Sequence, residues 1–227
     1  MSSNTIKLLA FDLDGTLLDS VPDLTTAVDL AMKAMGRPGA SEAQVRDWVG
    51  NGADTLVARA LSQDIEIDLS LTDESKSEAR AHFDRFYAEC GHTQSTLYPR
   101  VKESLRALHE AGYQLAVITN KPYQFVPEIL AQHGIDDLFI DVLGGDSLAK
   151  KKPDPLPLTH LMGKYQASLS ETVMIGDSKN DILAAKNAGV MSVALPYGYN
   201  HGEPIEQANP DHLIQDLSQL PELLTRC

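Results

Sequence analysis

Residues 6–16 read Ile-Lys-Leu-Leu-Ala-Phe-Asp-Leu-Asp-Gly-Thr, and this stretch decides the fold. Its first six residues form an apolar run typical of a buried strand, and turn residues follow it. Asp12 and Asp14 therefore lie at the strand tip, two positions apart, where extended backbone points both side chains to one face. Two carboxylates this close repel each other and retain protons unless a cation lies between them. The alternative is a surface Asp-Gly turn with an ordinary acidic neighbour.

Helical patterns alone follow, from residue 20 to residue 90. Ser41 and Gln44 have the spacing of a capping box, which predicts the start of a short helix. The last and longest pattern is amphipathic, and Phe83 lies on its apolar stripe, so we expect this ring in a helical core rather than around a ligand. The expected helices cover residues 21–35, 42–48, 53–61 and 72–90.

Strands alternate with helices from about residue 97 onward. This alternation is typical of a parallel sheet with right-handed crossovers. The predicted fold class is therefore α/β, with a Rossmann-like parallel sheet core and an inserted all-helical cap domain. The expected strands of this part are residues 114–119, 138–143, 173–176 and 192–195.

The predicted domains are an α/β core, residues 1–18 and 93–227, and a helical cap, residues 19–92, inserted after the first strand. An insertion at this point lies over the carboxyl end of that strand, where open α/β sheets bind their ligands. We therefore expect the cap to act as a lid.

Composition narrows the function classes. The 227 residues include 19 basic and 32 acidic side chains, a net charge of −13, which disfavours nucleic acid and anionic membranes as partners. The negative net charge does not exclude a small anionic substrate, because cations within the site can still bind one. Cys90 and Cys227 are far apart and lack metal-type spacing, which indicates a reduced, cytoplasmic protein. No run of eighteen apolar residues predicts a membrane span. The sequence leaves open whether the protein is a monomer or a homodimer.

Polar residues also follow the second strand. Thr119 and Asn120 stand where this strand meets a helix, and a helix start can bind an anion as well as simply be capped. Lys152 stands directly before Pro-x-Pro, which restricts its backbone away from the helical region. We expect it to face clustered carboxylates or a phosphate, although a lysine run is usually a solvated surface.

Two further aspartates, Asp177 and Asp181, follow the strand at residues 173–176. Capping of a helix explains one of them. It does not explain acidic groups at the ends of two separate strands, whereas a hard divalent cation does, since Mg²⁺ prefers oxygen ligands.

Together these segments resemble the haloacid dehalogenase superfamily of phosphohydrolases over essentially the whole chain. The signature is Asp-x-Asp-x-Thr, then Thr after the second strand, then Lys, then Gly-Asp-x-x-x-Asp, and all are present in order. The strings DLDGTLLDS, WVGNGAD, VITNKP, GGDSLAKKKPDP and GDSKNDILAAKNAG are similar to those of the bacterial phosphoglycolate phosphatases in that superfamily. The resemblance implies a Mg²⁺-dependent phosphatase of small phosphorylated metabolites, with 2-phosphoglycolate as the first choice.

The resemblance also implies residue roles. Asp12 is the nucleophile that forms an aspartyl-phosphate, and Asp14 is the general acid and base. The Asp12 carboxylate, the Asp14 carbonyl and Asp177 hold Mg²⁺. Asp181 does not contact the substrate but orients Lys152 or a metal-bound water.

Phosphoryl oxygens are expected to meet Thr119, Lys152 and the backbone N–H groups around Gly15 and Asn120.

Substrate choice is expected to lie in the cap. The segment Gly50-Asn51-Gly52 starts a helix and exposes N–H groups that suit an anion, which makes Asn51 and Gly52 candidate substrate contacts. Arg46, one turn earlier, is the nearest cation for a substrate carboxylate. The alternative is that the glycines only separate two helices and that Arg46 is solvated.

Three other functions stay open at this point. They are a phosphatase of another small metabolite or of pyrophosphate, a phosphomutase resembling β-phosphoglucomutase, and a non-catalytic module on the same scaffold. The intact acidic quartet argues against the last, because a module without metal would gain by losing those charges.

Overall fold

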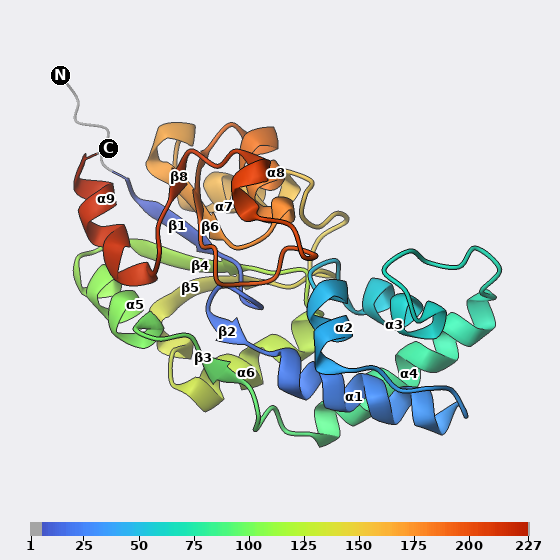
Figure 1. The fold of residues 1–227 in the computed structure, drawn as a ribbon. Coiled ribbons are helices and arrows are strands. Elements are labelled where there is room, and N and C mark those ends of the chain that lie inside the picture. Colours follow the sequence, from blue (N-terminus) through green and yellow to red (C-terminus); the bar gives the residue numbers. More distant parts are fainter. Residues whose placement is uncertain (1–5, 227) are drawn as a thin grey trace.

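The computed structural model describes residues 6–226, and its centre is a six-stranded parallel sheet (Figure 1). The strand order is β5-β4-β1-β6-β7-β8, so the opening strand pairs with a later strand on each side. This confirms the predicted fold class. The strands are β1 Leu8–Phe11, β4 Gln114–Ile118, β5 Phe139–Leu143, β6 Thr172–Gly176, β7 Met191–Ala194 and β8 His212–Leu213. The short edge strand β8 has no counterpart among the predicted strands.

Strand β1 is apolar throughout because both of its faces are covered. Leu9 and Phe11 pack in one core with side chains of α5 and α6, whereas Leu8 and Ala10 pack in another with side chains of α7 and α8. The helices of this part are α5 Val101–Glu110, α6 Val126–His133, α7 Leu156–Tyr165, α8 Lys179–Ala188 and α9 Leu220–Arg226.

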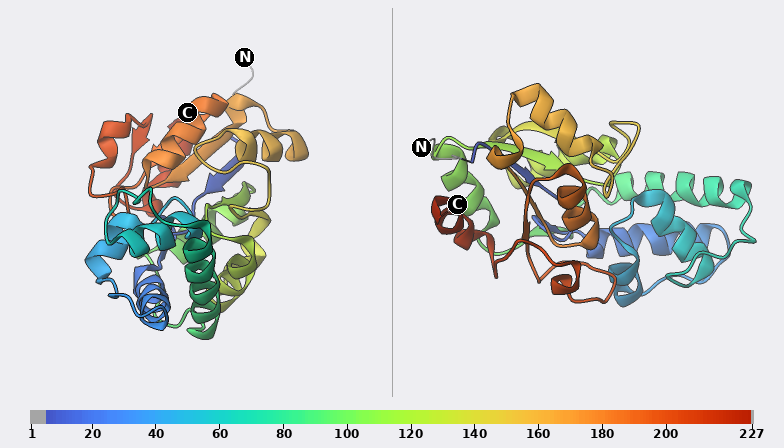
Figure 2. Two further views of the ribbon diagram at one scale, coloured as in Figure 1. Left: turned by 90° about the vertical axis from the view of Figure 1, so that its right-hand side faces the viewer. Right: turned by 90° about the horizontal axis from the view of Figure 1, so that it is seen from above.

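Apart from connecting loops, residues 20–90 form helices only, as predicted, and project from one end of the sheet (Figure 2). Helices α1 and α4 lie against each other, and α2 and α3 pack on them. The predicted capping box is present, since the Ser41 side chain accepts from the Gln44 N–H at the start of α2. These helices are α1 Val21–Ala34, α2 Glu42–Trp48, α3 Ala53–Ser62 and α4 Asp73–Glu89. We refer to α1–α4 as the cap.

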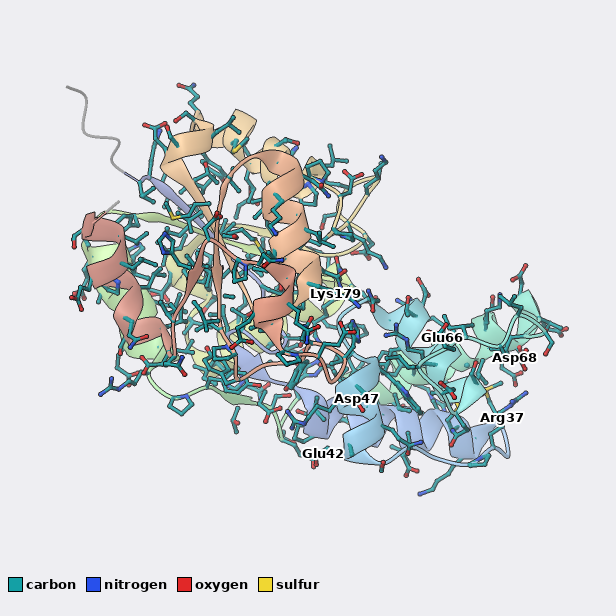
Figure 3. All side chains as sticks on the ribbon, turned by 45° about the horizontal axis from the view of Figure 1, so that its top comes forward. Arg37, Glu42, Asp47, Glu66, Asp68 and Lys179 are labelled. Carbon is teal, nitrogen blue, oxygen red and sulfur yellow. The ribbon has the colours of Figure 1, made fainter. Side chains whose placement is uncertain are left out.

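Two short antiparallel strands join the cap to the sheet. They are β2 Leu18–Asp19 on the way out and β3 Thr96–Leu97 on the way back. The buried Asp23 carboxylate accepts hydrogen bonds from the backbone N–H groups of Gln94 and Ser95, which fixes the returning segment against α1. The charged side chains Glu42, Asp47, Glu66 and Asp68 lie on the outer surface of the cap (Figure 3).

The structure shifts predicted boundaries in the last part of the chain. Helix α8 begins at Lys179 rather than Asp181, because Ser178 caps it and Asp181 lies in its first turn, where its carboxylate accepts a hydrogen bond from the Ser178 N–H. The predicted helix over 216–224 is instead a 3₁₀ turn, Leu217–Gln219, followed by α9. Within residues 6–226 no helix is long and apolar enough to cross a membrane. Cys90 has a free thiol, and Cys227 lies outside the described residues.

Candidate active site

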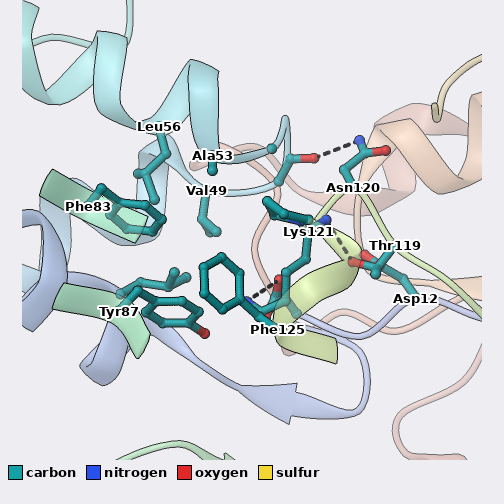
Figure 4. Close-up of a pocket in the computed structure, with 15 residues that line it drawn as sticks. Asp12, Val49, Ala53, Leu56, Phe83, Tyr87, Thr119, Asn120, Lys121 and Phe125 are labelled. Atoms are coloured by element: carbon teal, nitrogen blue, oxygen red, sulfur yellow. Dashed lines mark hydrogen bonds and ion pairs between the residues drawn. The ribbon is translucent and has the colours of Figure 1, made fainter. Parts of the chain in front are cut away.

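A pocket lies between the carboxyl ends of β1 and β4 and the underside of the cap (Figure 4). The sheet side contributes polar groups, and the cap contributes mostly apolar ones. Because strands β4 and β1 are parallel neighbours, residues that directly follow them necessarily meet at this edge. The lining residues are Asp12, Asp14, Leu24, Val49, Gly50, Gly52, Ala53, Leu56, Phe83, Tyr87, Thr119, Asn120, Lys121, Pro122 and Phe125.

A buried acidic cluster adjoins this pocket. Asp12, Asp177 and Asp181 each place one carboxylate oxygen within 4.8 Å of the others. Lys152, which is 2% exposed, is their cation: its Nζ lies 2.8 Å from Asp12 Oδ1 and 2.6 Å from Asp181 Oδ1. Burial raises the pKa of Asp12 to about 7 against the lowering effect of Lys152, and burial together with Asp181 and Asp12 raises the pKa of Asp177 well above its usual value.

The cluster has the chemistry of a divalent-cation site. Three buried carboxylates face one ammonium group, so negative charge is in excess. Lys152 pairs with Asp12 and Asp181, which leaves the Asp177 carboxylate without a cationic partner among the described residues. An all-oxygen donor set with excess negative charge fits a hard cation such as Mg²⁺.

Asp177 is held in place from several directions. Its Oδ1 accepts from Thr16 Oγ1 at 2.5 Å, and its Oδ2 accepts from the Tyr199 N–H at 2.6 Å. Backbone also approaches closely, because a Cβ atom on Gly15 or on Gly198 would lie 2.2 Å from Asp177 Oδ2. Both positions therefore require glycine, and Gly15 in addition has a φ of +92°.

Asp14 faces a different cation. Lys121 Nζ donates to Asp14 Oδ1 at 2.9 Å and to Oδ2 at 3.0 Å, and the Lys121 side chain is 3% exposed. Burial lowers the pKa of Lys121, but the Asp14 carboxylate and the Tyr87 hydroxyl together outweigh burial and raise that pKa. The sequence prediction omitted Lys121, although it directly follows Thr119 and Asn120 in the segment VITNKP.

The residues predicted to hold phosphoryl oxygens differ in how many of their hydrogen-bonding groups are already used within the protein. Thr119 is buried, and its Oγ1 accepts from the Lys121 N–H at 3.1 Å. The Asn120 side chain donates to the carbonyls of Gly50 and Lys152, each at 3.0 Å, so it ties the cap to the core. The Gly15 N–H already donates to the Leu18 carbonyl at 2.8 Å, which argues against its predicted contact with phosphate.

The predicted cap contacts are mostly engaged elsewhere. Arg46 is absent from the pocket lining, and its guanidinium stacks over Tyr199 at 5.0 Å and pairs with Glu42 at 3.3 Å. This position argues against the predicted contact with substrate. The Asn51 carbonyl accepts from Lys151 Nζ at 2.8 Å, and its side chain accepts from Arg59 at 3.1 Å.

Gly52 does line the pocket, at the start of α3 and with a φ of +90°. Phe83 is 1% exposed and stacks on Tyr87, with ring centroids 5.4 Å apart, as expected for a residue of the cap core. It nevertheless lines the pocket as well. The aromatic core of the cap is thus also the wall of the site.

The raised pKa of Asp12 leads to a prediction about stability without metal. Between about pH 4 and about pH 7 the folded chain keeps an Asp12 proton that the unfolded chain has released, so wild-type stability falls as pH rises through this window. Asp12→Asn removes this loss. We expect the free energy of unfolding of Asp12→Asn minus that of wild type, measured with urea in EDTA, to grow from about pH 4 to about pH 7 and then level off. A pH-independent difference would contradict this account of the cluster.

Comparisons with known proteins bear on the same site. Residues 6–189 match a hydrolase family described as haloacid dehalogenase-like hydrolase. A phosphoglycolate phosphatase of Vibrio vulnificus (strain YJ016) is 59% identical over 224 residues, which cover 99% of this chain and 98% of the relative. One of Vibrio cholerae is 58% identical and covers 97% of each chain. The crystal structure of a predicted phosphoglycolate phosphatase from Haemophilus somnus 129PT has a TM-score of 0.90 at 41% identity and covers 98% of this chain and 99% of that one.

Proposed function

The chain belongs to the haloacid dehalogenase-like hydrolase family, and we propose that it hydrolyses 2-phosphoglycolate to glycolate and phosphate. The observation that carries this proposal is the full-length similarity to proteins named phosphoglycolate phosphatase, at up to 59% identity. The site supports it, since the buried Asp12 carboxylate lines the pocket, pairs with Lys152 and belongs to an acidic cluster.

In the first step an Asp12 carboxylate oxygen attacks phosphorus, and the bond from phosphorus to the glycolate oxygen breaks. Asp14 gives that oxygen its proton, so glycolate leaves as an alcohol and Asp12 carries the phosphoryl group. In the second step Asp14 takes a proton from water as the water attacks phosphorus. The bond from Asp12 to phosphorus then breaks, which releases phosphate and restores both carboxyl groups.

Lys152 and Thr119 bind the phosphoryl oxygens in this proposal, and the rigid Asp181 carboxylate orients the Lys152 ammonium. Mg²⁺ bound by the Asp12 carboxylate, the Asp14 carbonyl and Asp177 supplies positive charge that offsets the repulsion between carboxylate and phosphate. We place the enzyme in the cytoplasm, where a reducing medium suits the free thiol of Cys90.

A phosphate-release screen over small phosphorylated metabolites tests the function. With Mg²⁺ and no sugar bisphosphate, we expect the highest kcat/KM for 2-phosphoglycolate and loss of activity in EDTA that Mg²⁺ restores. Release without a bisphosphate separates a phosphatase from a phosphomutase, which returns the phosphoryl group to a sugar phosphate. A higher kcat/KM for another metabolite, or for pyrophosphate, would overturn the substrate assignment, and full activity in EDTA would overturn the metal assignment.

A further inference from the structure

Lys121 stands out among the groups that line the pocket. The other ionisable lining residues on the sheet side, Asp12 and Asp14, are acidic, and Lys121 is the one cation of the described lining. It lies between the strand ends and the apolar wall of the cap (Figure 4). The steps proposed above give Lys121 no task, and its ion pair with Asp14 offsets the cost of burying an ammonium group beside the reacting atoms.

The other cations close to the site do not line the pocket. Lys152 lies between Asp12 and Asp181, and Lys151 Nζ donates to the Asn51 carbonyl. Arg59 donates to the carbonyls of Trp48 and Ile65 and to the Asn51 side chain, which fixes it inside the cap. Among the described residues that line the pocket, Lys121 is therefore the cation that a second anionic group on a substrate can reach, although it also pairs with Asp14.

The length of the substrate matches this position. In 2-phosphoglycolate one methylene separates the leaving oxygen from the carboxylate, so the carboxylate oxygens lie roughly 3 Å from the leaving oxygen by standard bond lengths. Asp14 must be within hydrogen-bond reach of the leaving oxygen in order to protonate it. Lys121 Nζ is 2.9 and 3.0 Å from the Asp14 oxygens, hence one hydrogen bond away from the group that meets the leaving oxygen.

Donors remain for such a carboxylate. An ammonium group has three N–H bonds, and the two contacts with Asp14 use at most two of them. Lys121 Nζ also lies 4.8 Å from the centre of the Tyr87 ring. Tyr87 lines the same pocket. Its hydroxyl is buried and has no hydrogen-bond partner within the described part of the chain.

We propose that Lys121 is the specificity-determining residue of this enzyme and binds the carboxylate of the substrate, with the Tyr87 hydroxyl as a second donor. This inference rests on the proposed function and replaces Arg46 as the cation that recognises the carboxylate. Leu24, Leu56, Phe83 and Phe125 line the same pocket with apolar surface, so an uncharged or longer alcohol group gains no comparable polar partner from them.

The test compares 2-phosphoglycolate with ethyl phosphate, which replaces the carboxylate by a methyl group. We expect Lys121→Met to lower kcat/KM for 2-phosphoglycolate roughly 100-fold more than for ethyl phosphate, chiefly through KM, since one partner of a buried charge pair is lost. Loss of the Asp14 contact affects both substrates and cancels in the ratio. Tyr87→Phe should lower the same ratio by a smaller factor, and Lys150→Met, a change at an exposed lysine, should leave it unchanged.

If Lys121→Met does not fold, the same comparison of the two substrates is made with Lys121→Gln and Tyr87→Phe. An equal loss for both substrates in these variants would restrict Lys121 to holding Asp14 and overturn the inference, while the wild-type preference for 2-phosphoglycolate would still uphold the proposed function. A wild-type enzyme that does not hydrolyse 2-phosphoglycolate would overturn both.

Discussion

Asp12→Asn is expected to lower kcat by roughly 10⁴-fold or more, because an amide oxygen is a poor nucleophile and the covalent step depends on this carboxylate. The variant should still fold. Asp12 is buried in an acidic cluster, and its raised pKa shows that its negative charge is costly there without metal, so a neutral side chain of the same shape relieves repulsion.

Steady-state phosphate release and thermal unfolding measure the two expectations together. Asp137→Asn is a matched control and should behave as wild type. Asp137 is exposed on the 3₁₀ turn before β5, at the amino ends of the strands, whereas the pocket lies at their carboxyl ends. Rapid quenching of wild type should reveal one phosphoryl group on the peptide that contains Asp12, and none in the variant. Wild-type turnover in Asp12→Asn would rule out the aspartyl-phosphate route.

Lys152→Met should damage both stability and catalysis. Lys152 is the cation between Asp12 and Asp181, and burial alone lowers its pKa while these two carboxylates reverse that effect and raise it. Removing one partner of a buried ion pair costs about 3–5 kcal/mol, since the remaining charge stays buried and unpaired. We also expect kcat to fall by roughly 10³-fold, because a positive charge on the phosphoryl oxygens is lost.

Urea unfolding in EDTA and in Mg²⁺ separates the two effects. A cation bound in the cluster supplies part of the missing charge, so Mg²⁺ should restore some of the lost stability without restoring kcat. Lys164→Met is the control, because Lys164 pairs with Asp141 on the surface at 51% exposure and its removal should cost at most about 1 kcal/mol. A Lys152→Met protein as stable as wild type in EDTA would show that Lys152 is not the main counter-charge of the cluster.

Much of the fold was predictable because its causes are local. An apolar run with turn residues at its end specifies a buried strand wherever it occurs, and residues 6–11, 114–119 and 173–176 all contain strands of the central sheet. The capping box of Ser41 is likewise a contact between residues three positions apart. The start of α8 was misplaced by two residues because Asp177, Ser178 and Asp181 are all plausible caps, and the pattern alone does not choose among them.

The order of residues along the chain sets which side chains follow the strands, and parallel pairing then gathers them at one edge of the sheet: Asp12 after β1, Thr119 after β4 and Asp177 after β6. Which of these side chains contact one another depends on long-range packing. Lys121 and Asp14 are 107 positions apart, and Arg46 turns to Tyr199 instead of the pocket. Such contacts depend on how the cap packs on the core and on which rotamers the packing permits, and no short-range pattern encodes either, because both result from the whole chain closing around a shared interior.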